Sequence, residues 1–261
     1  MGKIKDTSAY VGFGDLKKVD TYKALLAELV GSLVLVVIGC GSCVSTLTAE
    51  NPTGIAPTVV GIAFAFGVAV ATMAQAVGHV SGCHINPAVT CGMLVARHIS
   101  VTKALLYIIV QCLGGVVGAA ILKGVSPDGV WGATTVSPLI NSGQAFGIEL
   151  VITFILVLVV FGVCDDRRND VKGSAPLAIG LSITACHLVA VPLTGASMNP
   201  ARTFGPSVIF NSWANHWVYW AGPILGGIIA AVLYTFVFRA PKPQEREVEL
   251  DNINKTQRNY N

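Results

Sequence analysis

The chain of 261 residues alternates between long apolar stretches and short polar connections. Six apolar runs are each close to the roughly 20 residues that a spanning helix needs. They are Leu25–Cys40, Thr58–Val77, Ala104–Leu122, Phe146–Cys164, Ala175–Pro192 and Trp217–Phe238. One such run could be the core helix of a large soluble protein. Six in a chain of this length predict an all-α membrane protein, in which residues 1–22 form an N-terminal segment and residues 240–261 a disordered tail.

Composition and charge placement agree with this interpretation. Apolar residues make up 53% of the chain and charged residues only 12%, about half of what a soluble domain carries. The basic residues cluster before the first run, after the last run, and in the second and fourth connections. By the positive-inside rule, both termini are predicted to be cytoplasmic. The net charge of +3 is therefore a signal of topology, and we expect no nucleic-acid partner.

The two halves of the chain repeat each other. "AELVGSLVLVVIG", which contains Glu28, matches "IELVITFILVLVVFG", which contains Glu149, and "CLGGVVGAA" matches "ILGGIIAAV". The first repeat covers about 23–124 and the second about 144–239, within one channel-like domain of 23–239. Each repeat holds three spans, and an odd number forces the second repeat to cross the membrane in the opposite direction. The sequence therefore predicts an inverted-topology repeat.

Each repeat also carries one Asn-Pro-Ala motif between its second and third spans. The motifs are Asn86-Pro87-Ala88 and Asn199-Pro200-Ala201, and the apolar stretches that follow are too short to cross a bilayer. Proline just after a polar residue is typical of a helix N-terminus. We therefore expect two re-entrant half-helices whose N-termini meet near the middle of the membrane.

Glu28 and Glu149 are the carboxylates that fall inside the six predicted spans. Helix N-termini expose unpaired N–H groups, and non-helical backbone at membrane depth must be buried in protein or line water. We expect each glutamate to accept hydrogen bonds from the re-entrant loop of its own repeat. The alternative is that the pair titrates or binds a transported cation.

Other chemistry is not indicated. The seven cysteines lie in or beside apolar runs and show no metal-ligand spacing, so we expect neither a metal site nor a disulfide framework. The glycines do not form a phosphate-binding loop, so no cofactor is expected. We read many of them, such as Gly67, Gly114 and Gly180, as sites of close helix approach in a membrane.

The segments "SGCHINPAVT", "SMNPARTFGP" and "HWVYWAGPILGG" make the chain resemble the aquaporin (major intrinsic protein) family from about Lys23 to Arg239. The resemblance implies six transmembrane helices and two half-helices, with a pore in each monomer and four monomers in a cell-membrane homotetramer. It also implies that Asn86 and Asn199 donate hydrogen bonds to passing water, while the two dipole ends repel protons and cations.

The resemblance further implies a selectivity constriction made by Phe66, His187, Ala196 and Arg202. Taken alone, His187 could be an ordinary core histidine. The water-selective branch is favoured by His187 and by Thr203, where glycerol-conducting members have a small residue and aspartate, respectively. Many mammalian water channels have cysteine in place of Ala196, whose smaller side chain leaves room for leakage of a small neutral solute.

The predicted function is thus a passive, water-selective channel and not an enzyme. Three alternatives remain open: a glycerol or urea facilitator of the same fold, an alternating-access transporter, and a junctional or adhesion protein with little transport. Cys83 lies three residues before Asn86, as Ala196 does before Asn199, so the inverted symmetry makes it a candidate mercurial site on the cytoplasmic side of the pore. The alternative for Cys83 is an inert buried thiol.

Overall fold

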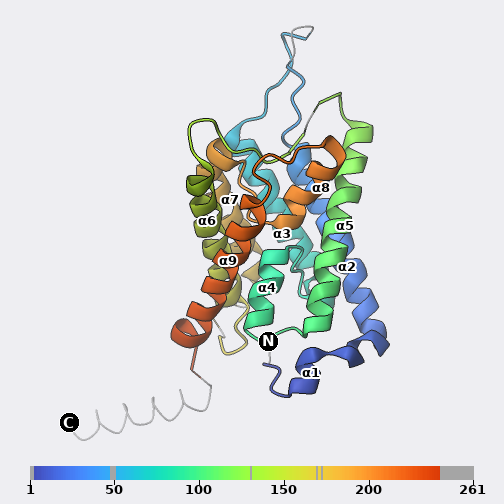
Figure 1. Ribbon diagram of the computed structural model, residues 1–261, viewed down its shortest axis with the longest axis vertical. Coiled ribbons are helices and arrows are strands. Elements are labelled where there is room, and N and C mark those ends of the chain that lie inside the picture. Colours follow the sequence, from blue (N-terminus) through green and yellow to red (C-terminus); the bar gives the residue numbers. More distant parts are fainter. Residues whose placement is uncertain (1–2, 48–50, 130, 169, 172, 242–261) are drawn as a thin grey trace, which may run out of the picture.

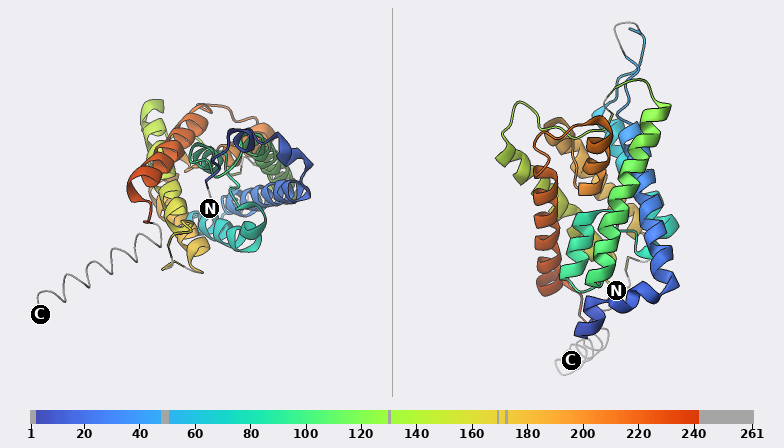
Figure 2. Two further views of the ribbon diagram at one scale, coloured as in Figure 1. Left: turned by 90° about the horizontal axis from the view of Figure 1, so that it is seen from below. Right: turned by 45° about the vertical axis from the view of Figure 1, so that its right-hand side comes forward.

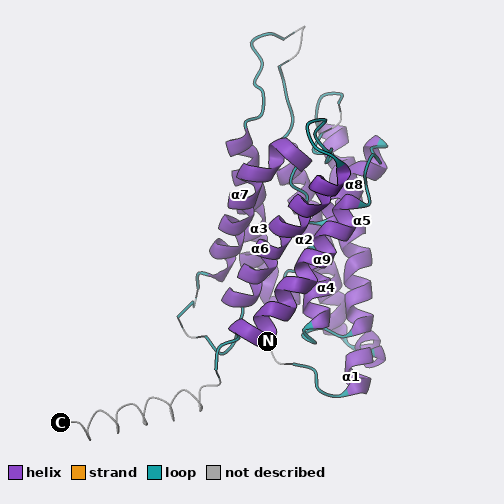
Figure 3. Cartoon of the chain, turned by 60° about the vertical axis from the view of Figure 1, so that its left-hand side comes forward, coloured by secondary structure: helices purple, strands orange, loops and turns teal. Residues whose placement is uncertain are grey.

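The computed structural model describes residues 3–47, 51–129, 131–168, 170–171 and 173–241. Within these residues the chain forms helices and loops, without β-strands (Figures 1 and 3). In chain order the elements are α1 (Thr7–Val11), η1 (Phe13–Lys17), α2 (Val19–Gly41), α3 (Val59–Ser81), α4 (Pro87–Val95), α5 (Val101–Val125), α6 (Ser142–Val163), α7 (Ala175–Thr194), α8 (Pro200–Phe210), α9 (Val218–Leu233) and η2 (Tyr234–Phe238). The predicted disordered tail lies almost wholly outside the described residues.

Six helices in the described part of the chain are long and apolar enough to cross a membrane. They are α2, α3, α5, α6, α7, and α9 continued by the π-helical turn η2. Their lengths of 20 to 25 residues correspond to about 30–38 Å, which matches the hydrocarbon core of a bilayer. The prediction of six spanning helices is confirmed. The first begins at Val19, six residues before the predicted run, because its polar first turn extends beyond the apolar core.

Helices α4 and α8 are too short to span, with 9 and 11 residues. Both begin at the proline of an Asn-Pro-Ala motif, where the missing N–H removes a donor that would otherwise be unpaired. Asn86 caps α4 by accepting a hydrogen bond from the Ala88 N–H at 2.8 Å, and Asn199 caps α8 in the same way through Ala201 at 3.0 Å. In Figure 1 the two half-helices lie one above the other among the long helices.

Each half-helix packs against the third long helix of the other repeat, α4 on α9 and α8 on α5. Glycines make this close approach possible. A Cβ atom on Gly205 of α8 would lie 2.2 Å from the carbonyl oxygen of Gly115, and one on Gly92 of α4 would lie 3.1 Å from that of Gly227. Because each half-helix packs against the other repeat, the two repeats form one bundle, which Figure 2 shows from below as a ring of helices.

Polar contacts anchor the N-terminal segment at the end of the bundle that carries α1. The hydroxyl of Tyr10 donates to the carbonyl of Leu94 at 3.1 Å, which docks α1 under the end of α4. Asp15 accepts hydrogen bonds from Ser100 Oγ at 2.5 Å and from Lys18 Nζ at 2.7 Å. Burial raises the pKa of Asp15, but these two partners more than offset it and hold the pKa below its ordinary value. The segment before α2 is therefore anchored to the α4–α5 connection.

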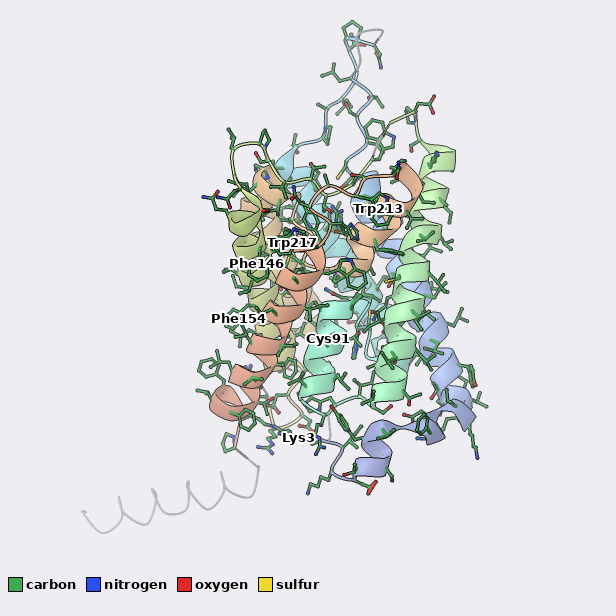
Figure 4. All side chains as sticks on the ribbon, viewed as in Figure 1. Lys3, Cys91, Phe146, Phe154, Trp213 and Trp217 are labelled. Atoms are coloured by element: carbon green, nitrogen blue, oxygen red, sulfur yellow. The ribbon has the colours of Figure 1, made fainter. Side chains whose placement is uncertain are left out.

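The tryptophans Trp213 and Trp217 lie toward the opposite end. Figure 4 shows Trp213, Trp217 and Phe146 far from Lys3. The Phe146 and Trp217 rings stack with centroids 5.9 Å apart, and Trp217 is 52% exposed. Half-exposed tryptophans of this kind are enriched at membrane–water interfaces.

The α5–α8 contact yields a test of the packing. Gly205→Ala places a methyl group against the backbone of α5, so the helices must separate at a cost of about 1–3 kcal/mol. We expect a lower thermal midpoint for the purified protein in detergent. Gly78→Ala in α3 is the matched control, because no heavy atom lies within 4 Å of its Cβ position. Equal midpoints for the two variants would contradict the packing described here.

Candidate functional site

The loop before each half-helix adopts a left-handed backbone at three positions, which are equivalent in the two repeats. The residues concerned have φ between 43° and 87° and are Gly82, Cys83 and Ile85 in the first repeat and Gly195, Ala196 and Met198 in the second. Positive φ is uncommon for non-glycine residues and is an outlier for a β-branched isoleucine. Such a backbone persists only where its surroundings hold it in place.

Glu28 of α2 holds the first loop. Its fully buried carboxylate accepts hydrogen bonds from the backbone N–H groups of His84 and Ile85 at 2.9 and 2.6 Å. The side chains of Ser81 and Gln111 also donate to it, each at 2.7 Å. These donors occupy both carboxylate oxygens, as expected for a buried acid that supports a backbone.

Glu149 of α6 makes the equivalent contacts in the second repeat. It accepts from the N–H groups of Ser197 at 2.9 Å and Met198 at 2.8 Å, and from Thr194 Oγ1 at 2.7 Å. The same arrangement occurs twice, around different neighbouring side chains. This repetition favours the supporting role for both glutamates over cation binding.

The two motif asparagines bridge the repeats. Asn86 Nδ2 donates to the carbonyl of Met198, and Asn199 Nδ2 donates to the carbonyl of Ile85, both at 2.8 Å. Each side-chain amide has two N–H donors. One N–H of each amide therefore donates to the loop of the other repeat, and the second N–H is available to a molecule beside the motif.

Sequence reasoning did not identify a second symmetric pair that holds the loops. Tyr107 Oη donates to the carbonyl of Ser81 at 2.8 Å, and Tyr219 Oη donates to the carbonyl of Thr194 at 2.9 Å. Tyr219 follows Tyr107 by 112 residues, the spacing that also relates the two Leu-Gly-Gly segments. Extending the alignment of the Leu-Gly-Gly segments upstream to these tyrosines would have found this pair.

Three of the four predicted constriction residues lie together. The Phe66 and His187 rings stack with centroids 4.6 Å apart, and Arg202 Cζ lies 4.7 Å from the Phe66 centroid. The Arg202 guanidinium donates to the carbonyls of Gly132 and Gly195. His187 Nδ1 lies 3.0 Å from the carbonyl of Ile183, which assigns the proton to Nδ1 and leaves Nε2 as an acceptor.

The buried His187 Nε2 and Arg202 Nε have no hydrogen-bond partner among the residues that the structure describes. Buried polar atoms are normally paired with protein or ordered water. One of these atoms accepts and the other donates, so the pair matches the two functions of a water molecule.

A cavity of about 60 Å³ connects these features. Its wall includes the two motif asparagines and the Phe66, His187 and Arg202 group. The rest of the wall is largely apolar and includes Val70, Val89, Leu156 and Ile183. The volume accommodates a short row of water molecules.

The two residues that the symmetry pairs before the asparagines behave differently. Cys83 is partly exposed and contributes to the wall of the cavity. Ala196 is fully buried and is not among the described residues that line the cavity. The second loop instead lines the cavity with Ser197 and Met198, and its Gly195 carbonyl lies 3.5 Å from Arg202 Nη2.

Six spanning helices with two half-helices meeting head to head along a narrow cavity define a channel-type membrane protein. The chain belongs to the major intrinsic protein family, whose family model matches residues 15–234.

The individual relatives agree. The chain is 49% identical to aquaporin-4 of Mus musculus over 220 residues, which cover 83% of this chain and 68% of the relative. It is 43% identical to aquaporin-1 of Canis lupus familiaris, with 88% and 87% covered. Its fold matches the X-ray structure of the aquaglyceroporin from Plasmodium falciparum with a TM-score of 0.73 at 24% identity, covering 84% of this chain and 97% of that one.

The support of the second loop can be tested through Glu149. Glu149→Gln replaces one acceptor oxygen by an NH₂ group, which leaves an N–H of Ser197 or Met198 unpaired at about 1–3 kcal/mol. We expect a lower thermal midpoint and reduced water permeability of reconstituted protein. Asp20→Asn in α2 serves as the control, because the Asp20 carboxylate lies in an exposed ion pair with Lys23. If Glu149→Gln had the same thermal midpoint and water permeability as this control, the supporting role would be ruled out.

Proposed function

We propose that the protein is a passive channel that conducts water in single file along osmotic gradients. One observation carries this proposal above all: the narrow cavity that connects the motif asparagines with the Phe66, His187 and Arg202 group. It is lined by apolar side chains on most of its surface, with few donors and acceptors. Water can therefore pass between successive polar sites without being held strongly at any of them.

Exclusion of ions follows from the half-helices. The N-termini of α4 and α8 direct the positive ends of their dipoles toward the middle of the cavity. The free N–H of Asn86 and that of Asn199 donate to a passing water oxygen, which orients the water there. In aquaporin-type pores, lining donors and the positive ends of half-helix dipoles raise an electrostatic barrier to protons and cations. Arg202 adds a permanent positive charge at the constriction.

Selectivity for water over polyols is proposed for the constriction. Phe66 and His187 form a stacked ring pair, and Arg202 lies next to it. A polyol entering this opening would lose its hydration and leave hydroxyl groups unpaired against the phenyl ring. Each unpaired group costs about 1–3 kcal/mol, and each 1.36 kcal/mol of barrier is roughly tenfold in rate. The similarity to aquaporin-4 and aquaporin-1 supports the same assignment.

The cellular arrangement is part of the proposal. The charge distribution supports cytoplasmic termini in a multi-pass plasma-membrane protein. Exposed apolar side chains on the spanning helices, such as Val60, Phe64, Leu181 and Val189, support burial against lipid or neighbouring copies in a homotetramer.

Stopped-flow measurement on proteoliposomes tests the function. The proposal predicts fast shrinkage in a sucrose gradient with a low activation energy, and slow re-swelling when the solute is glycerol. Equally fast entry of glycerol would favour the facilitator. Saturable solute flux would favour an alternating-access transporter, and the absence of any flux would favour an adhesion protein.

The steric basis of selectivity predicts a gain of function. His187→Gly together with Phe66→Ala removes both rings and leaves Arg202 to donate to a hydroxyl oxygen. Water flux should survive and glycerol flux should rise at least about tenfold over the unmodified protein. Comparable glycerol flux in both proteins would show that the constriction does not exclude polyols.

Cys83 supplies a separate test, because its side chain lies in the cavity wall. A membrane-permeant mercurial should attach to its thiol and obstruct the water path. Inhibition should be lost in Cys83→Ser and retained in Cys112→Ser, whose cysteine lies on α5 outside the described cavity wall. Inhibition that persists in Cys83→Ser would assign it to another cysteine.

A further inference from the structure

Gly39 in α2 lies directly behind the constriction. A Cβ atom on Gly39 would lie 2.4, 2.5 and 2.8 Å from three atoms of the Phe66 ring. Ordinary van der Waals contact begins near 3.4 Å. The phenyl ring therefore occupies the space that a side chain at position 39 would need, and a methyl group there requires a displacement of about 1 Å.

The ring is the part that can move. Helix α2 is held against α5 by backbone contact, because a Cβ on Gly114 would lie 2.3 Å from the Leu29 carbonyl oxygen and one on Gly118 would lie 2.7 Å from that of Leu33. Away from α2, Phe66 meets His187 and Arg202. A ring pushed from α2 therefore moves toward the other members of the constriction.

The inverted repeat does not require glycine at this position. In the alignment that pairs Glu28 with Glu149, Gly41 corresponds to Gly162, so both repeats have glycine at that position. Gly39 corresponds to Val160. General helix packing within the repeat therefore does not account for Gly39, whereas its contact with Phe66 does.

We propose that Gly39 is a positioning residue that sets the width of the constriction by allowing Phe66 to rest against α2. This inference depends on the proposed water-channel function. A side chain at position 39 moves the ring into the water path, and the effect increases with the size of the side chain. Gly39 thereby contributes to selectivity without touching the permeating molecule.

The test compares osmotic water permeability per channel in proteoliposomes for the unmodified protein, Gly39→Ala, Gly39→Val, and both variants combined with Phe66→Ala. We expect Gly39→Ala to lower permeability about threefold or more and Gly39→Val to lower it further. Adding Phe66→Ala should restore permeability to that of Phe66→Ala alone, because the displaced ring is absent. Gly41→Ala is the control, since its Cβ would meet no heavy atom closer than 3.6 Å.

Wild-type permeability in both single variants would overturn the inference. So would a loss that Phe66→Ala does not relieve, or failure of the double variants to insert, because either result would assign Gly39 to helix packing. An unmodified protein that does not conduct water would remove the proposed function and this inference with it. A conducting unmodified protein with unaffected variants would remove this inference alone.

Discussion

Two helices begin inside the membrane, and the rest of the structure depends on how the N–H groups at their N-termini are paired. A bilayer interior offers no water to unpaired backbone groups, so each loop and each first helical turn must find partners within the protein. Glu28 and Glu149 supply acceptors for the loop N–H groups, and the side chains of Asn86 and Asn199 cap the half-helices. The strained backbone at Ile85 and Met198 is tolerated because these acceptors hold it in place.

The inverted repeat solves this pairing problem for both halves at once. Each asparagine amide donates to a carbonyl of the opposite loop, so neither loop is complete without the other. Each half-helix also packs against a long helix of the other repeat. The donors that remain after this mutual support face the cavity. The same groups thus stabilise the fold and provide the polar sites that we propose water uses.

Much of this arrangement could be predicted from the sequence because it depends on local pattern. Span length, the Asn-Pro-Ala helix starts and the spacing of the repeats predict six spanning helices, two half-helices and their inverted relation. The positions of Phe66, His187 and Arg202 came from a family resemblance, and in the structure these residues meet. The equivalence of Tyr107 and Tyr219 follows from the spacing of the repeats, but sequence reasoning did not identify it.

Other features depend on contacts between distant segments, which local pattern does not encode. The Arg202 guanidinium is held by the carbonyl of Gly132, a residue in the connection between α5 and α6. The Phe66 ring of α3 rests where a side chain at position 39 of α2 would lie, and Gly39 has no side chain. Ala196 is buried away from the cavity wall, although Cys83 lines the wall from an equivalent left-handed turn. Each of these requires the relative placement of helices.

The motif asparagines join the repeats, and we propose that they also present neutral donors to permeating water. The most direct measurement is the water permeability of Asn86→Asp and Asn199→Asp in proteoliposomes, normalised to correctly inserted protein. A carboxylate lacks the N–H groups that reach the opposite loop and the cavity, although the nearby helix dipole would partly stabilise its charge. We expect reduced permeability or reduced stable insertion for each variant. Unchanged flux through both, at normal levels of insertion, would contradict it.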